Sequence, residues 1–217
     1  AIIDGQSVLS LIHLSDMKGV NVRPREGREL AGFWWVAPNR VMYTLAERSG
    51  PLEVPASTGE LYAVNADGGS DGILFGYRMG TQGASHITHA TSRMAYALLV
   101  DPLRDDPRHA LIATYAVNGP NLGRSRTAST NGVFPDVERI DIFSGATTPV
   151  TVSPMRNASF LTDHHGRVRF AYGFDADQTA RVWYRAGDDA NWTLLLDEAR
   201  EHRRMLPLAF NRNESKV

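Results

Sequence analysis

Hydrophobic residues along the chain occur in short runs of aromatic and β-branched side chains, separated by Gly, Pro, Asn and Asp. This pattern is typical of β-strands joined by turns. In one run Val168, Phe170 and Tyr172 alternate with Arg and Ala, which puts the three on one face of a strand. Helical periodicity is nearly absent, and the best helical stretch, residues 196–205, lacks an apolar face. We predict an all-β fold with strands at residues 33–36, 40–45, 60–64, 73–77, 94–100, 110–117, 137–142, 150–152, 167–172, 181–184 and 192–196, and a core strand within residues 7–14.

The predicted strands recur in sets of four. A hairpin over residues 33–43 is matched by one over residues 158–170, by a looser copy over residues 95–115 and by a short copy that begins at residue 206. Each of the first three is followed by a second hairpin. Four antiparallel strands per repeat are the signature of β-propeller blades, and an irregular β-sandwich is the alternative.

Counting the repeats predicts one incomplete β-propeller of four-stranded antiparallel blades over residues 1–217. The full blades are expected near residues 30–78, 93–154 and 157–197, with partial blades at residues 1–29 and 205–217. Propellers usually have about four to eight blades, so we expect the chain to be a piece of something longer. An open ring leaves two unpaired sheet edges, and these predict a homodimer formed through the edges.

Composition excludes several classes of function. The chain has no cysteine, which excludes disulfide bonds, a cysteine nucleophile and a thiolate zinc site. A formal net charge of −1 argues against a dedicated binder of nucleic acid or of an anionic membrane. No run of apolar residues is long enough for a transmembrane helix. Nearly all basic residues are arginine, as in GC-rich bacterial genomes, and either the bacterial cytoplasm or the periplasm fits the sequence.

Three polar motifs could bind metal, and each has a simpler explanation. His86 and His89 are spaced like half of a metal site but lie in a Gly- and Ser-rich linker without a nearby acid. Asp163, His164 and His165 lie at a predicted hairpin turn, where Asp is common for conformational reasons. Residues 65–71 resemble a calcium loop but lack its final Glu. We predict three ordinary loops, no metal and no cofactor.

Several motifs together resemble one family of enzymes. They are Gly32-Phe33-Trp34-Trp35 with Asn39-Arg40-Val41-Met42-Tyr43, and the stretches 59–68, 137–145, 163–169, 182–185 and 192–195. This set is similar to the N-terminal propeller of bacterial prolyl-oligopeptidase-family serine peptidases of the acylaminoacyl-peptidase and dipeptidyl-aminopeptidase-like type. The resemblance implies a propeller that lies over a C-terminal α/β-hydrolase domain, which carries the Ser of a Gly-x-Ser-x-Gly elbow and its Asp and His partners.

Within these residues we predict no Gly-x-Ser-x-Gly elbow and no catalytic triad, so the chain alone is not expected to be an enzyme. The α/β-hydrolase domain is predicted to be absent from this chain. The adjacent Glu pair with which the dipeptidyl type holds a substrate N-terminus is also absent. The resemblance therefore implies a non-catalytic propeller that shields or gates the active site of that hydrolase domain and helps to select peptide substrates. The alternatives are a stand-alone propeller for protein interaction and a propeller glycosidase, which would need paired carboxylates.

Two further groups of residues carry predictions. Residues 117–135 form a long polar insertion, and Arg124 and Arg126 within it are candidates for a substrate-selection loop, with a plain surface loop as the alternative. The four tryptophans, Trp34, Trp35, Trp183 and Trp192, are predicted to anchor the packing between blades.

Overall fold

The structure is a computed structural model, and it describes residues 1–25, 27–48, 50, 54–79, 93–117 and 133–217. The prediction of an all-β fold is confirmed, and every strand predicted between residues 33 and 196 overlaps an observed strand. Helical structure in the described residues is limited to α1 (Glu198–Glu201), one turn within the stretch that has the best helical pattern in the sequence. The Asp197 carboxylate caps this turn by accepting a hydrogen bond from the Ala199 N–H.

Three four-stranded antiparallel sheets form most of the molecule, which confirms the predicted strand pattern. Strands pair in chain order within each sheet, and none of the sheets closes on itself. Sheet 1 contains β5 (Arg28–Ala37), β6 (Arg40–Glu47), β7 (Ala56–Asn65) and β8 (Gly72–Phe75). Sheet 2 contains β9 (Ala95–Asp101), β10 (His109–Ala116), β11 (Asp136–Asp141) and β12 (Thr147–Val152). Sheet 3 contains β13 (Ser159–Thr162), β14 (Val168–Phe174), β15 (Ala180–Tyr184) and β16 (Thr193–Asp197).

Two short hairpins precede sheet 1. They are β1 (Ile2–Ile3) with β2 (Gln6–Ser7), and β3 (Leu9–Ile12) with β4 (Gly19–Val22). Leu9 and Leu11 of β3 share a hydrophobic cluster with Val41 of β6 and Val64 of β7. The predicted core strand at residues 7–14 is therefore observed as β3, and it covers one face of sheet 1.

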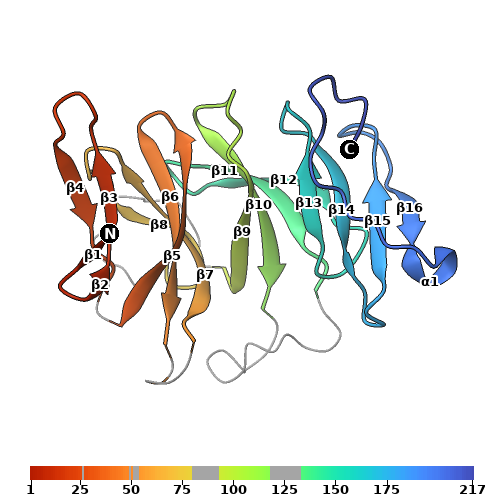
Figure 1. Cartoon of the computed structure of the whole chain (residues 1–217), viewed down its shortest axis with the longest axis horizontal. Coiled ribbons are helices and arrows are strands. Elements are labelled where there is room, and N and C mark those ends of the chain that lie inside the picture. Colours follow the sequence, from red (N-terminus) through yellow and green to blue (C-terminus); the bar gives the residue numbers. More distant parts are fainter. Residues whose placement is uncertain (26, 49, 51–53, 80–92, 118–132) are drawn as a thin grey trace.

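The sheets follow one another in chain order across the molecule, from β1–β4 at the left to β16 at the right (Figure 1). Sheets 1 and 2 bury a common core that includes Leu61, Leu74, Ile112 and Ile140. Sheets 2 and 3 share a smaller core around Leu111 and neighbouring residues. Strands such as β6 are buried along nearly their whole length because both faces of the sheet are covered, which explains their continuous apolar sequence.

Tight contacts set the spacing of neighbouring sheets. The buried guanidinium of Arg40 on β6 donates from Nε to the carbonyl oxygen of Ile142, directly after β11 of sheet 2, at a distance of 2.6 Å. The turn after β11 contains Gly145 at φ +72°, and a Cβ atom there would overlap the carbonyl oxygen of Leu74 on β8. Only glycine satisfies both conditions, so the turn can lie directly against sheet 1.

One predicted strand is wrong. Residues 206–210 were expected to start another hairpin, but they form no strand. Pro207 removes a backbone donor, and Phe210 packs against Phe170 of β14 with ring centroids 5.7 Å apart. The following turn is closed by a hydrogen bond from Glu214 N–H to the Asn211 carbonyl. This segment therefore covers sheet 3 through side-chain packing and adds no strand to a sheet.

Candidate functional site

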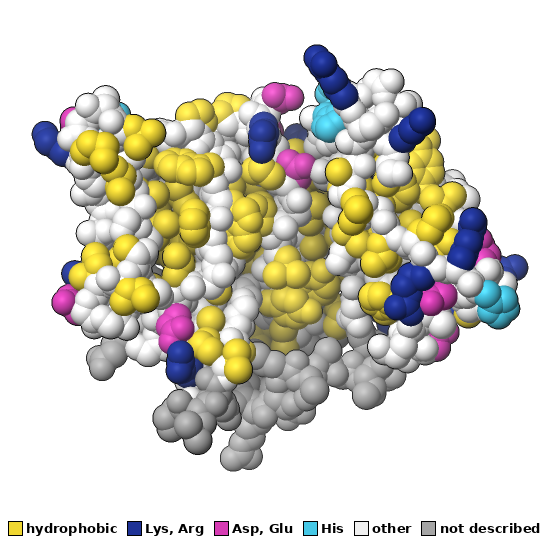
Figure 2. Space-filling view, in the orientation of Figure 1, with side chains coloured by type: hydrophobic (Ala, Val, Ile, Leu, Met, Phe, Trp, Pro, Cys, Tyr) yellow, Lys and Arg dark blue, Asp and Glu magenta, His cyan; other side chains and the backbone are white. Residues whose placement is uncertain are grey.

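The first strand of sheet 1 carries three consecutive exposed aromatic side chains, with Phe33 and Trp35 on one face of the sheet and Trp34 on the other. Phe33, Trp34 and Trp35 on β5 are 54%, 40% and 52% exposed. Figure 2 shows hydrophobic side chains gathered over β5 and β6 on the face in view. The prediction that Trp34 and Trp35 anchor blade packing is wrong, because both side chains are exposed and neither belongs to the core clusters on the two faces of sheet 1. Trp192 packs in the core shared by sheets 2 and 3, as predicted, whereas Trp183 packs against Met155, Ala158 and Ala171.

The aromatic row has the features of a contact surface. Edge strands usually carry Lys, Pro or inward-pointing charges that discourage pairing, and the stretch from Gly32 to Ala37 carries none of these. Exposed aromatic side chains are common where proteins meet partners or ligands, and here they occur on both faces of one edge strand. The registers of β5 and β6 also shift next to Gly32 and next to Val36, so the row lies between two irregularities of the strand. We call Phe33, Trp34 and Trp35 the aromatic edge.

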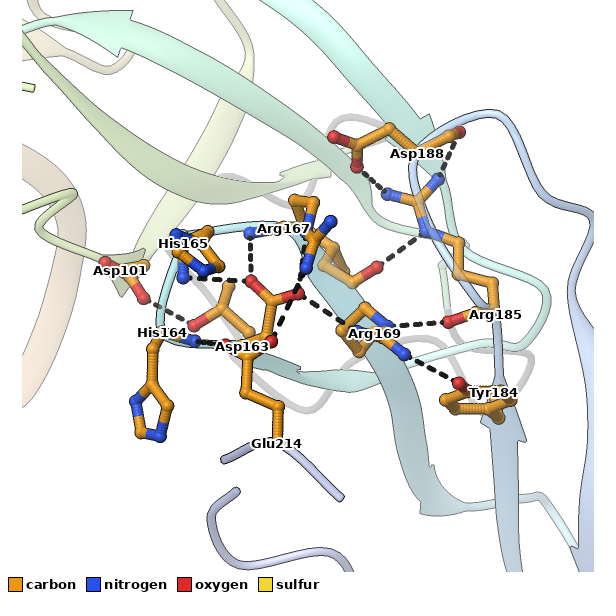
Figure 3. Close-up of polar contacts among 12 residues, drawn as sticks. Asp101, Asp163, His164, His165, Arg167, Arg169, Tyr184, Arg185, Asp188 and Glu214 are labelled. Carbon is orange, nitrogen blue, oxygen red and sulfur yellow. Dashed lines mark hydrogen bonds and ion pairs between the residues drawn. The ribbon is translucent and has the colours of Figure 1, made fainter. Parts of the chain in front are cut away.

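A polar cluster surrounds the turn between β13 and β14 (Figure 3). The Asp163 carboxylate is nearly fully buried and accepts hydrogen bonds from the backbone N–H groups of His165 and Arg167, both at 3.0 Å. Its second oxygen accepts from Arg167 Nε at 2.7 Å and from Arg169 Nη1 at 3.0 Å. Burial raises the pKa of Asp163, but these hydrogen bonds outweigh burial and hold the pKa below its ordinary value.

Arg169 and Arg185 connect this turn to the interior of sheet 3. Arg169 donates from Nε to the Arg185 carbonyl at 3.0 Å and from Nη2 to the Tyr184 hydroxyl at 2.6 Å. Arg185 is buried and donates from Nε to the Val168 carbonyl at 2.7 Å. Because both oxygens of Asp163 are already used, the cluster holds the turn in place and leaves no free carboxylate for acid–base chemistry.

A shallow pocket of about 560 Å³ lies beside the Asp163 turn. It is lined by His164, His165, Arg212, Asn213 and Glu214. Glu214 accepts from the backbone N–H of His164 at 2.8 Å, and His164 Nε2 lies 3.1 Å from the Asn211 carbonyl oxygen. Throughout the described residues, no group of three or more His, Cys, Asp or Glu side chains could hold a metal ion.

Two buried glutamates in sheets 1 and 2 were not identified from the sequence. Glu60 on β7 is fully buried, and its Oε2 accepts from the Tyr62 hydroxyl and from Arg78, both at 3.0 Å. Glu138 on β11 accepts from Arg93 and from Thr114, both at 2.7 Å. Burial raises the pKa of Glu138, but its hydrogen bonds bring that pKa below the ordinary value. An acidic residue inside an apolar strand was the signal that could have identified both.

The pattern Gly-x-Ser-x-Gly does occur in the sequence, at residues 68–72, where Ser70 is the central residue. The prediction that this pattern is absent is therefore wrong. Ser70 has φ +50°, but it lies in the hairpin turn between β7 and β8. A nucleophile elbow joins a strand to a helix, and here a second strand follows. Among the described residues, the Ser70 hydroxyl makes no hydrogen bond to a His or Asp. The same stretch, expected as a tight turn and not as a calcium loop, is a turn.

The remaining candidates from the sequence lie outside the described residues. Arg124 and Arg126 of the predicted substrate-selection loop belong to residues 118–132, and His86 and His89 belong to residues 80–92. The described residues contain no helix that is long and apolar enough to span a membrane.

No protein-family model and no curated protein matches the chain. The resemblance to the prolyl-oligopeptidase family therefore stays a prediction that rests on the hairpin motifs alone.

Proposed function

We propose that this chain is a non-catalytic part of a β-propeller that shields the active site of a serine peptidase and helps to select its peptide substrates. The observation that carries the proposal is the repetition of one unit: three antiparallel sheets of four strands, each paired in chain order and each packed against the next. Propeller blades have this architecture. The family motifs in the same hairpins supply the link to a peptidase.

In a propeller the first strand of each blade lies beside the central channel. The corresponding strands here are β5, β9 and β13, and each is an edge strand of its sheet. Under the proposal, the aromatic edge of β5 faces the channel and contacts peptides on their way to the hydrolase domain. Aromatic side chains suit this role because they bind apolar side chains without requiring one sequence. Arg124 and Arg126 are proposed to contribute a second contact with the substrate.

A stand-alone interaction module is the second candidate, and one observation favours it. The aromatic edge lies on a strand with an unpaired side, which is the geometry used when an extended partner adds a strand to a sheet. A second copy of the chain is one such partner and would form the homodimer predicted from open sheet edges. Reaction of the complete protein with a serine-directed probe distinguishes the two, because the peptidase role requires a hydrolase domain with a reactive serine and the interaction module does not.

The proposal is tested on the complete protein that contains this chain. Peptides of increasing length with a chromogenic leaving group are hydrolysed by the unchanged protein and by a Trp34→Ser, Trp35→Ser variant. We expect the unchanged protein to prefer short peptides, and the variant to show an altered preference among peptides with different side chains. Trp192→Ser, which alters a packed tryptophan of sheet 3, serves as a control for general destabilisation. A protein that hydrolyses none of the peptides would contradict the proposal.

A further inference from the structure

The free side of β5 is open to pairing along the stretch that carries the aromatic edge. Within the described part of the chain, β5 pairs only with β6. Just before this stretch, the Leu30 N–H donates to the Ser7 hydroxyl at 2.9 Å, so the free side is occupied there. From residue 32 to residue 37, no backbone group bonds to a described residue outside the pair with β6. Alternate residues of an edge strand direct their N–H and C=O groups away from the neighbouring strand, so this stretch offers unpaired donors and acceptors.

The aromatic edge borders this free side on both faces of the sheet. Trp34 lies opposite Met42, which belongs to the core shared with sheet 2. Phe33 and Trp35 lie opposite residues of the core that β3 covers. A Cβ atom at Gly32 would lie 2.9 Å from Cη2 of Trp34, so the indole lies along the strand and over Gly32. The free side therefore has an aromatic wall on each face.

Aromatic walls on both faces favour an extended partner. A flat surface or a small ligand on one face would contact Trp34 alone, or Phe33 and Trp35 without Trp34. A strand added to β5 directs successive side chains to opposite faces, so three consecutive residues of that strand contact all three aromatic side chains. Pairs of an aromatic residue with a β-branched or aromatic residue across two strands are stabilising. The geometry therefore selects a segment with three such residues in a row.

The size of the aromatic edge indicates a short segment and not a second folded copy of the chain. Its three side chains are between 40% and 54% exposed. Since a whole aromatic side chain offers about 150–250 Å², together they leave roughly 300 Å² open to a partner. A stable interface between folded proteins buries about 800 Å² on each side. The aromatic edge supplies well under this area, whereas an added strand also gains affinity from its main-chain hydrogen bonds.

Charge restricts the segment further. Residues 32–37 carry no charge. The charged residues at the start of β5 are already paired, Arg28 with Glu47 at 2.7 Å and Glu29 with Arg48 at 2.9 Å. An acidic residue in the middle of the segment would therefore lie against the negative faces of aromatic rings without a counter-ion.

We propose that residues 32–37 bind an extended peptide segment as a fifth strand of sheet 1, and that this segment has three consecutive β-branched or aromatic residues and no acidic residue among them. This inference rests on the proposed function in taking a peptide as the occupant, and it adds how the peptide binds and which peptides are selected. Strands that are apolar on both faces are buried in folded proteins. The partner is therefore an unfolded chain or a fragment of one.

The test is a calorimetric titration of the 217-residue chain with acetyl-Lys-Thr-Val-Ile-Val-Thr-Lys-amide. We expect saturable binding with a Kd below about 1 mM. Asp in place of Ile in the peptide should weaken binding at least about tenfold. Trp34→Ser and Trp35→Ser, made singly, should each weaken binding about two- to fivefold, although the two side chains lie on opposite faces. Leu208→Ser, which alters an exposed apolar residue far along the chain from β5, should leave the Kd unchanged.

A peptide N-methylated at Val, Ile and Val tests the main-chain pairing on the unchanged chain, so its result does not depend on the folding of a variant. It keeps every side chain and loses its central donors, so it should bind at least about tenfold more weakly. The proposal is overturned if the unmodified peptide does not bind at about 10 mM, if the N-methylated peptide binds equally well, or if either tryptophan variant keeps the full affinity. A dimer in light scattering that Trp35→Ser abolishes would identify a second copy as the occupant and would also overturn it.

Failure of this binding is distinguishable from failure of the proposed function. The titration requires no hydrolysis, so an absence of binding overturns the added strand and leaves the shielding role to be judged by peptide hydrolysis. A complete protein that binds the peptide and hydrolyses none contradicts the peptidase role and leaves the added strand supported.

Discussion

Replacing Asp163 by Asn should destabilise the protein more than its position in a turn suggests. Asn keeps one oxygen for the backbone N–H groups of His165 and Arg167, but its amide nitrogen then faces Arg169 Nη1, and two donors cannot bond to each other. Breaking a buried pair by changing one partner typically costs about 3–5 kcal/mol. Arg167 is partly exposed, and Arg169 keeps its bonds to Tyr184 and to the Arg185 carbonyl, so we expect about 3 kcal/mol.

Urea unfolding followed by tryptophan fluorescence measures this loss at pH 7, with Asp4→Asn as the matched control. Asp4 pairs with Arg23 at 3.4 Å on an exposed surface, and this pair should contribute less than about 1 kcal/mol. Because the pKa of Asp163 is lowered in the folded protein, its contribution is complete above the unfolded pKa of about 4 and is lost as the pH falls through the folded value. The gap between wild type and variant should therefore be constant from about pH 5 to 8 and narrow in more acidic solution. A loss below about 1 kcal/mol at pH 7, or a gap that widens with acidity, would refute this reasoning.

Three further predictions concern packing and surface. Gly145→Ala should lower the free energy of unfolding by more than the roughly 1 kcal/mol that a positive φ costs an alanine, because the added Cβ overlaps the Leu74 carbonyl. Gly5 also has a positive φ but has open space around it, so Gly5→Ala should cost only the roughly 1 kcal/mol of the backbone conformation. Urea unfolding of both variants measures the difference. Trp183→Phe removes a buried N–H that has no acceptor among the described residues but also leaves space in the packing around Met155, so the two effects should nearly cancel and the free energy of unfolding should change by less than about 1 kcal/mol; a loss of about 3 kcal/mol would contradict this. Trp35→Ser should cost about 2 kcal/mol, because about half of the large indole surface is buried. It should also reduce any self-association seen by light scattering, and undiminished association would exclude Trp35 as part of the contact.

The strand order of the three sheets could be predicted from the sequence because each signal was local. Runs of aromatic and β-branched residues end at turn residues, and hairpins join neighbours in the chain, so pairing in chain order needs no long-range information. The failure at residues 206–210 also has a local cause. Its hydrophobic residues matched a strand, but Pro207 and the contact of Phe210 with Phe170 favour packing over pairing.

Burial at strand edges and donors without partners could not be predicted from local patterns. The Trp34-Trp35 pair is hydrophobic, but its exposure depends on which strand ends a sheet and on what lies beside that strand. A pocket lined by Trp183 and Arg156 joins segments from residues 134 to 194, and no spacing rule connects them. Ser70 illustrates the opposite error, because a match to five letters has chemical meaning only where a strand leads into a helix.

The measurement that tests the central claim most directly is labelling by a fluorophosphonate probe, with the modified serine located by peptide mass spectrometry. Two samples are compared, the 217-residue chain and the complete protein that contains it. The proposed non-catalytic propeller role predicts no labelling of the chain, Ser70 included, and labelling of the complete protein at one serine outside these residues. Labelling of Ser70, or an unlabelled complete protein, would contradict it.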